Sequence, residues 1–159
     1  MKAAFTIPVC PKSLQFSGKR VMVRHGKPVF FKTKKAVWFI DLVALFSKSH
    51  LPPRPCSGPI RMSVVYVLER PQALSGKKHP QGRIAHTKRP DCDNLQKGVQ
   101  DALKGFWEDD AQICDLHIVK FYAAKGESPK IEISIESIDE SLSTSHRRLE
   151  VGNGAPDAC

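Results

Sequence analysis

The segment 89–113 constrains the fold of this chain more than any other stretch. Near its start is Pro90, which disfavours helical backbone at the residue before it. Apolar residues then recur at i, i+4, i+7 and i+8, a spacing that lines one face of a helix, and Gly105 follows where helices commonly end in left-handed backbone. The segment therefore predicts a short amphipathic helix between Pro90 and Gly105, with Asp93 or Asn94 as its N-cap. Its apolar stripe is Leu95, Val99, Ala102 and Leu103.

Carboxylates gather at both ends of this predicted helix. Asp91 and Asp93 stand at its start, and the sequence Glu-Asp-Asp at 108–110 follows its end. A helix of about eleven residues is about 16 Å long, so the second cluster reaches the first only if the chain folds back. A strand at 113–122 that runs antiparallel to the helix would bring the two clusters together. Carboxylates that meet around one point repel one another unless a cation lies between them, and such oxygen ligands suit Mg²⁺ or Mn²⁺.

Charge divides the chain into a basic first part and an acidic second part. Residues 1–90 hold 18 lysines and arginines and two acids, whereas residues 91–159 hold 14 of the 16 acids. The net charge is +9, and a basic body with one compact acidic centre suits an enzyme that processes phosphodiesters, because cations attract the polyanion. The alternative is a generic basic surface whose charges are solvated.

Composition also excludes several classes of protein. With 159 residues, 41% of them apolar, the chain is expected to form one domain with a real core. It has no apolar run long enough for a transmembrane helix, and its N-terminus is too short and interrupted for a signal peptide. The five cysteines are scattered and lack zinc-finger spacing. We therefore expect reduced thiols in a cytoplasmic protein.

Periodicity elsewhere predicts an α+β fold, with a small mixed or antiparallel sheet and two main helices. Strands are expected where apolar and polar residues alternate, and a further helix where apolar residues cover most of a helical surface. The expected domain spans residues 1–138, and residues 139–159, which lack periodicity, are expected to form a disordered tail. The predicted strands are 3–9, 21–24, 29–31, 60–68, 113–123 and 130–138, and the further helix is 34–48.

The loop 70–89 is rich in cations and leads directly to Asp91. Long loops in compact domains are commonly functional or disordered, and lysine and arginine side chains bind phosphate groups without reading base sequence. We therefore expect a mobile loop that contacts DNA, with a purely disordered loop as the alternative. The expected DNA-binding residues are Lys77, Lys78, Arg83, Lys88 and Arg89.

The motif around the predicted helix resembles that of the RusA family of Holliday-junction resolvases. The similarity lies in Arg-Pro-Asp-Cys-Asp-Asn-Leu-Gln-Lys at 89–97, Asp-Ala-Leu at 101–103 and Gly-Phe-Trp-Glu-Asp-Asp-Ala-Gln-Ile at 105–113. The resemblance implies a small α+β fold that works as a homodimer. It also implies an Mg²⁺-dependent endodeoxyribonuclease, with Mn²⁺ able to substitute, that resolves four-way DNA junctions by paired symmetric nicks in recombination and repair.

The same resemblance implies roles for individual residues. Asp91, Asp93 and Asp110 would be catalytic carboxylates that hold the metal, and Lys97 would be the essential lysine one helical turn after Asp93. A metal held by carboxylates polarises the phosphoryl oxygen and helps to ionise the attacking water. Lys97 would then neutralise the charge that grows on the phosphate in the transition state.

Two further acids, Asp101 and Asp109, match family positions and are candidates for additional ligands. Asp101 has a second interpretation, because it lies four residues after Lys97 and shares one side of the helix with it. Opposite charges at that spacing form a weak ion pair, worth a few tenths of a kcal/mol.

Other interpretations of the acidic motif are weaker. A calcium-binding loop that starts at Asp91 fails, because its sixth position would be Gln96 instead of glycine and its twelfth Ala102 instead of glutamate. A nucleotide-sugar transferase, another class with an Asp-x-Asp motif, fits poorly with the basic first half of the chain. Two alternatives stay open: a non-catalytic DNA-binding or structural module, and a less selective nuclease for branched DNA.

Overall fold

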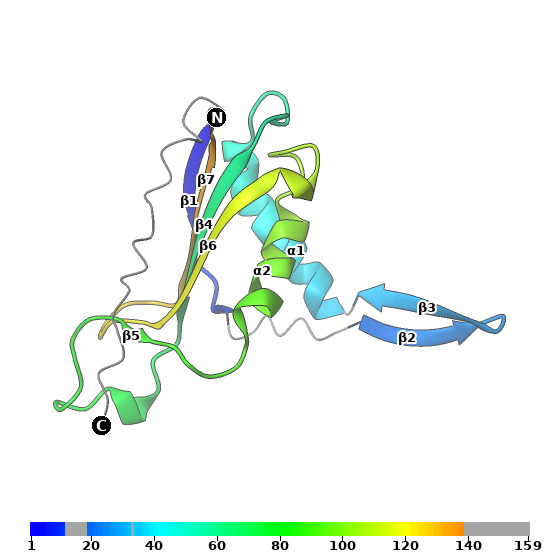
Figure 1. The fold of residues 1–159 in the computed structure, drawn as a ribbon. Helices are drawn as coiled ribbons and strands as arrows, with labels where there is room; N and C mark the ends of the chain where they lie inside the picture. The colour runs from blue at the N-terminus through cyan, green and yellow to red at the C-terminus, as the bar shows by residue number, and fades with distance from the viewer. Residues whose placement is uncertain (12–18, 33, 139–159) are drawn as a thin grey trace, which may run out of the picture.

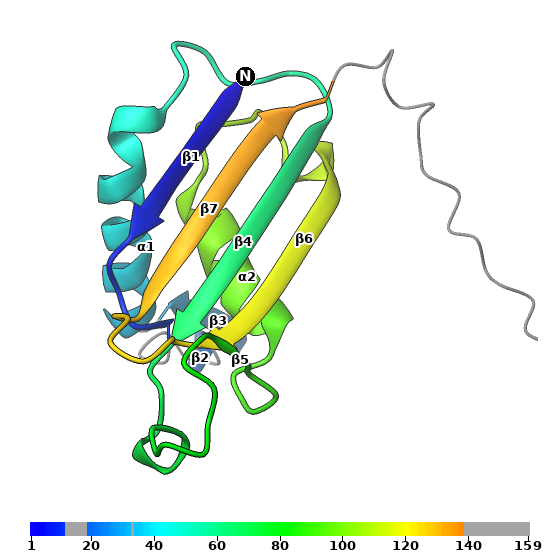
Figure 2. The same cartoon turned by 90° about the vertical axis from the view of Figure 1, so that its left-hand side faces the viewer.

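The computed structural model describes residues 1–11, 19–32 and 34–138. Its centre is a five-stranded sheet in the order β1-β7-β4-β6-β5, in which β4 pairs with β6 in parallel and with β7 in the antiparallel sense. Two helices cover one face of this sheet (Figures 1 and 2). The predicted α+β fold with a small mixed sheet and two main helices is therefore confirmed. The strands are β1 Lys2–Ile7, β4 Ile60–Leu68, β5 Ile84–Ala85, β6 Ile113–Tyr122 and β7 Lys130–Ser137.

The two helices, α1 Lys34–Ser47 and α2 Cys92–Ala102, bury their apolar stripes against the sheet. The predicted stripe of α2, which includes Leu95 and Val99, is buried as expected, and α1 buries Phe39 completely. None of the helices in the described ranges is long and apolar enough to cross a membrane. The described ranges also contain three short 3₁₀ helices, η2 Lys48–His50, η3 Gln72–Leu74 and η4 Asp110–Gln112.

The central strand β4 shows why the helices lie on one face only. Its alternate residues from Ile60 to Leu68 are buried beneath the helices, because successive side chains of a strand point to opposite faces. On the other face, Arg61 donates a hydrogen bond of 3.1 Å to Glu136 and also pairs with Asp115. Figure 2 views this second face, which no helix of the described residues covers.

A second, two-stranded sheet stands apart from the body. Strands β2 Lys19–Arg24 and β3 Lys27–Lys32 pair in the antiparallel sense around the turn at His25 and Gly26, which both have positive φ. Both residues of a type I′ hairpin turn need positive φ. The strands expected at 21–24 and 29–31 therefore pair as a hairpin, and Figure 1 shows that it projects from the helix side of the molecule. The predicted tail, 139–159, lies outside the described residues.

Candidate active site

Asp91 is the N-cap of α2, so the expectation that Asp93 or Asn94 caps this helix was wrong. Asp91 has extended backbone, with φ −76° and ψ 157°, and its carbonyl accepts the hydrogen bond from Leu95 N at 3.2 Å. Its side chain makes no capping bond, and both Asp91 and Asp93 are exposed. Two carboxylates are therefore presented to solvent at the N-terminal end of a helix, where the helix dipole is positive.

The chain that enters Asp91 is held by a lysine from the sheet. Lys120 on β6 donates hydrogen bonds from Nζ to the carbonyl oxygens of Lys88, at 3.1 Å, and of Pro90, at 2.7 Å. A half-buried lysine whose ammonium group donates to two carbonyls fixes the path of the loop where it becomes the helix. Lys120 therefore positions the backbone just before Asp91.

Helix α2 is fixed to the sheet by one buried polar pair. The Tyr66 hydroxyl on β4 donates to Oε1 of Gln96 at 3.2 Å, and Nε2 of Gln96 lies 3.3 Å from Sδ of Met62. Burial raises the pKa of Tyr66 well above its ordinary value, so the hydroxyl keeps its proton and remains a donor. The residue after Gln96, Lys97, is exposed and lies one turn after Asp93.

The second acidic cluster forms a rigid turn at η4. Asp109 caps η4 through a hydrogen bond of 2.8 Å from Ala111 N to Oδ1, and Oε1 of Gln112 accepts from Asp109 N at 2.7 Å. Oδ1 of Asp110 accepts from Nε1 of Trp107 at 2.8 Å. A carboxylate has about four lone-pair sites, so both aspartates can still accept a cation. Gln112 also donates to the carbonyl oxygens of Cys56 and Gly58, at 2.8 and 2.9 Å.

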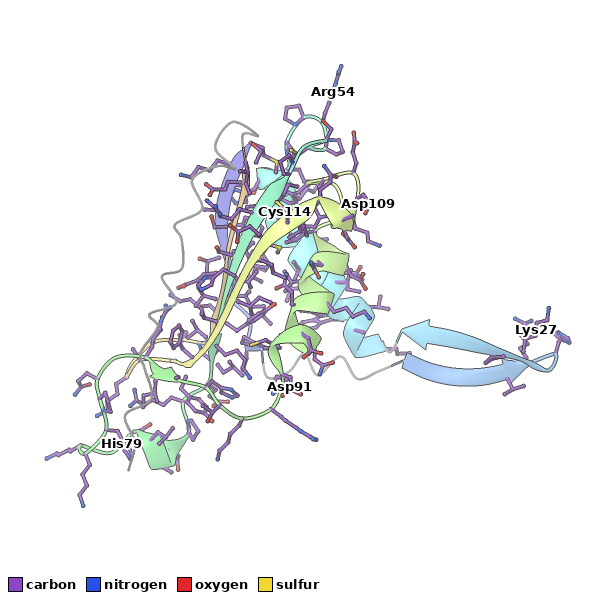
Figure 3. The ribbon with its side chains drawn as sticks, in the orientation of Figure 1. Lys27, Arg54, His79, Asp91, Asp109 and Cys114 are labelled. Carbon is purple, nitrogen blue, oxygen red and sulfur yellow. The ribbon has the colours of Figure 1, made fainter. Side chains whose placement is uncertain are left out.

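The two acidic clusters do not meet within one chain. Strand β6 does run antiparallel to α2, as predicted (Figure 1), but η4 precedes this strand and stays beside the C-terminal end of the helix. Figure 3 shows Asp91 and Asp109 at opposite ends of α2. In the described ranges, no three side chains of the His, Cys, Asp and Glu types are grouped closely enough to hold a metal ion. The expectation that strand direction alone brings Asp110 to Asp91 and Asp93 was therefore wrong.

The basic loop before Asp91 is held to the sheet by ion pairs. Arg83 donates to Glu132 at 2.7 Å and to Glu127 at 3.0 Å, and Lys130 lies 3.1 Å from Glu127. These contacts raise the pKa of Arg83, with the Glu132 hydrogen bond as the main cause, and the Arg83 hydrogen bond lowers the pKa of Glu127 to about 2. A DNA contact by Arg83 stays a prediction, and it would compete with these pairs. The other four predicted cations, Lys77, Lys78, Lys88 and Arg89, are exposed.

Arg70 organises the same loop from within. Its guanidinium donates to the carbonyl oxygens of Leu74 at 2.9 Å, Pro80 at 2.7 Å and Gly82 at 3.1 Å. The segment is irregular, so these carbonyl groups have no partners within a helix or a sheet, and the bonds from Arg70 satisfy them instead. The loop therefore follows a path held by hydrogen bonds from Arg70, and its mobility stays a prediction.

A pocket lies where this loop passes the end of the sheet. Its volume is about 230 Å³, and the ring centroids of His86 and Tyr122 in its wall are 4.5 Å apart. Lys88 and Arg89 give it a positive rim beside the entry to α2. Its lining is Leu68, Glu69, Pro71, His86, Lys88, Arg89 and Tyr122.

Four residues that shape the site were not assigned from the sequence: Gln96, Trp107, Gln112 and Lys120. Three of them lie inside the motif at 89–113, where a buried or capping role could have been read from their position beside the acids. Lys120 carries no such signal, because its target carbonyls at Lys88 and Pro90 are about thirty residues away along the chain.

Comparison with known proteins gives one family and several relatives. The family model described as Endodeoxyribonuclease RusA matches residues 11–136. A Bacillus subtilis protein with the printed name "Uncharacterized protein YqaN" is 34% identical over 125 residues, which cover 75% of this chain and 86% of that protein. The crossover junction endodeoxyribonuclease RusA of Escherichia coli K12 is 48% identical over 50 residues, 30% of this chain and 40% of that protein. The enzyme of the same name from Enterobacteria phage 82 matches to the same extent.

Proposed function

We propose a function from one premise: this chain belongs to the RusA endodeoxyribonuclease family. The proposal is that it cuts four-way DNA junctions by paired symmetric nicks, in an Mg²⁺-dependent reaction in which Mn²⁺ can substitute. Relatives of the chain carry the name crossover junction endodeoxyribonuclease, and a role in recombination and repair of bacterial or phage DNA in the cytoplasm follows from the same substrate.

The observation that supports this function most directly is the start of α2. Asp91 and Asp93 present two exposed carboxylates there, and Lys97 is exposed one turn later. Carboxylates of this kind suit Mg²⁺, while a lysine beside them stabilises negative charge on a reacting phosphate. Asp110 is the third proposed ligand, with Asp101 and Asp109 as further candidates. Within one chain these groups do not form a complete metal site among the described residues.

The cations of the loop would bind the DNA backbone. Lys77, Lys78, Lys88 and Arg89 are exposed on the segment that leads to Asp91, and contacts from lysine and arginine to phosphates fix the register of a protein on DNA. Such binding weakens steeply as salt concentration rises, because it depends on counterion release. Paired nicks require two active sites, and a homodimer with twofold symmetry supplies them.

The test compares junction binding with junction cutting in Asp91→Asn. This change keeps the shape of the side chain and removes its charge, so binding should persist. Cutting should fall by about a hundredfold or more, because metal catalysis supplies several kcal/mol and about 1.4 kcal/mol corresponds to tenfold in rate.

Asp115→Asn is the matched control for this test. Asp115 lies on the uncovered face of the sheet, paired with Arg61, and its change should leave both binding and cutting intact. Cutting by Asp91→Asn at the wild-type rate would refute the assignment. Tight binding by the wild type without cutting under any divalent metal would favour a structural DNA-binding module.

A further inference from the structure

The pocket beside the start of α2 has buried rings in its wall and no role in the function proposed above. Three of its lining side chains are buried: Tyr122 is 9% exposed, His86 8% and Leu68 1%. The chain that borders it runs from β5 to the start of α2 (Figure 1). The pocket therefore combines an apolar, aromatic interior with a position next to the candidate active site.

The size of the pocket suits a single ring system. Its volume is about 230 Å³, whereas sites for whole small molecules usually measure about 300–1,000 Å³. The rings of His86 and Tyr122 are 4.5 Å apart and tilted by 55°, so a guest ring would pack against the wall that they form. Aromatic walls of this kind bind nucleobases, because every base has a π-face that can stack on an aromatic ring.

The rim of the pocket is charged. Lys88, Arg89 and Glu69 line it, and all three are exposed. A nucleotide with its base in the pocket would keep its phosphates beside the two cations, which outnumber the single negative charge. An ionised carboxylate only accepts hydrogen bonds, so Glu69 favours a base with an exocyclic amino group and disfavours thymine.

Strand β6 fixes the pocket in place relative to the start of α2. Lys120 and Tyr122 are alternate residues of this strand, so their side chains point to the same face of the sheet. Tyr122 lines the pocket, while Lys120 donates to the carbonyl oxygens of Lys88 and Pro90. His86 N in turn donates to the carbonyl oxygen of Lys120 at 3.0 Å. The wall of the pocket and the backbone that enters α2 are thus held by one strand.

We propose that this pocket receives one unstacked base of the strand that is cut, from a nucleotide next to the phosphate held at Asp91 and Asp93. Arg89 on the rim is two residues before Asp91, and two residues of extended chain span at most about 7 Å. Neighbouring nucleotides of one strand can therefore reach both places. The inference rests on the proposed nuclease function and adds a base-binding site to it.

Such a pocket would also favour branched DNA over a linear duplex. A base in a duplex must leave its stack to enter a protein pocket, and the cost is least where pairing or stacking is already broken. A branch point is such a place. The preference for a junction would then come from the ease with which a base is released to the pocket.

A free nucleotide fits these observations less well than a base of DNA. The pocket is smaller than the usual site for a whole small molecule. Its cations also continue a series of exposed cations in the same loop, with Lys77 and Lys78 before them, and a series of cations suits a chain of phosphates better than a single phosphate.

Removal of single bases from the substrate tests the inference with the wild-type protein. Four-way junctions are made with one abasic nucleotide, placed in turn at each position near the mapped cut, and cutting is measured at low protein concentration. One position next to the cut should lower cutting by about tenfold or more, because stacking of a base on an aromatic ring contributes about that factor in affinity. Equal cutting of every abasic junction would overturn the inference.

Tyr122→Leu tests whether this pocket is the place that receives the base. The change removes the ring and keeps an apolar side chain, so cutting of the intact junction should fall by about tenfold. The abasic position that affects the wild type should then cause no further loss, because both changes remove one interaction. A further loss as large as that of the wild type would overturn the inference.

Phe121→Leu is the matched control for the ring. Phe121 is the neighbouring residue on β6, and successive side chains of a strand point to opposite faces. This variant should cut intact junctions at the wild-type rate and remain sensitive to the same abasic position. Loss of that sensitivity in Phe121→Leu would overturn the assignment to the pocket.

Binding measurements distinguish this inference from the proposed function. Asp91→Asn protein, with and without Tyr122→Leu, is titrated with the same junctions, and the loss of affinity should occur at the same abasic position and only where Tyr122 is present. Free deoxyadenosine monophosphate should leave junction binding unchanged. Competition by this nucleotide that depends on Tyr122 would assign the pocket to a free nucleotide and overturn the inference. A wild type that cuts no junction would refute the proposed function, whereas a wild type that cuts every abasic junction equally would refute the base-binding pocket alone.

Discussion

Loss of the buried hydrogen bond between Tyr66 and Gln96 should loosen α2 from the sheet. The two atoms are 3.2 Å apart, Tyr66 is completely buried and Gln96 is 3% exposed. Tyr66→Phe removes the donor and leaves the Gln96 carbonyl buried without it. An unsatisfied buried polar group of this kind costs about 1–3 kcal/mol. We therefore expect the free energy of unfolding to fall by about that amount.

The double variant separates the hydrogen bond from simple loss of packing. Gln96→Leu alone leaves the Tyr66 hydroxyl without its acceptor and should cost a similar amount. Tyr66→Phe combined with Gln96→Leu removes both polar groups, and replacement of both partners by apolar groups can be nearly neutral. The double change should thus cost clearly less than the sum of the single changes, with a coupling energy of about 1–2 kcal/mol.

Urea unfolding of the four proteins measures this coupling. All four are compared at pH 7 and at one protein concentration, because the stability of an oligomer depends on concentration. Equal slopes of the free energy of unfolding against urea concentration would show that the changes act on stability alone. The role given to this pair would be refuted if the losses in free energy of unfolding of the two single variants simply added up in the double variant. It would also be refuted if Tyr66→Phe were as stable as the wild type.

Three further outcomes follow from contacts around the loop and the helix end. Arg83→Ala should lower the free energy of unfolding by about 1–2 kcal/mol at pH 7, measured by urea unfolding, and an unchanged value would contradict the ion-pair assignment. The folded-state pKa of Glu127, about 2, is below its ordinary value of 4.5, so this stabilisation is complete above pH 4.5 and lost as the pH falls through 2. The difference in the free energy of unfolding between wild type and Arg83→Ala should therefore shrink as the pH falls over that range. A difference that stays constant would contradict the pairing of Arg83 with Glu127. Gly105→Ala should lower the melting temperature more than Gly126→Ala. Both glycines have positive φ, but only at Gly105 would an added Cβ approach Leu51, to 3.3 Å. Equal shifts in melting temperature would refute the contribution of this contact with Leu51.

The elements of this fold could be predicted because each depends on local periodicity. The stripe from Leu95 to Leu103 predicted α2, and the alternation along residues 60–68 predicted β4, since burial of one face is encoded residue by residue. Gly105 was expected as the residue that ends α2, but the helix ends at Ala102 with Leu103 as its C-cap, and Gly105, with φ +118°, follows two residues after that cap. The cap was misplaced because Asp91, Asp93 and Asn94 are all good N-cap residues, and sequence alone does not choose among them.

The arrangement of the site could not be predicted because it depends on distant pairings. Arg83 looked like a free cation in a basic loop, and its partners Glu127 and Glu132 lie 44 and 49 residues later. The direction of β6 was predicted correctly, yet the acids at 108–110 precede that strand, so its return does not carry them to Asp91.

Cleavage of a labelled four-way junction, beside a linear duplex of matching sequence, tests the central claim most directly. The reaction is run with Mg²⁺ and, separately, with EDTA, and the products are mapped on all four strands. We predict paired, symmetric nicks in the junction alone, which disappear with EDTA. Intact junctions under every divalent metal, or equal cutting of the linear duplex, would contradict the account.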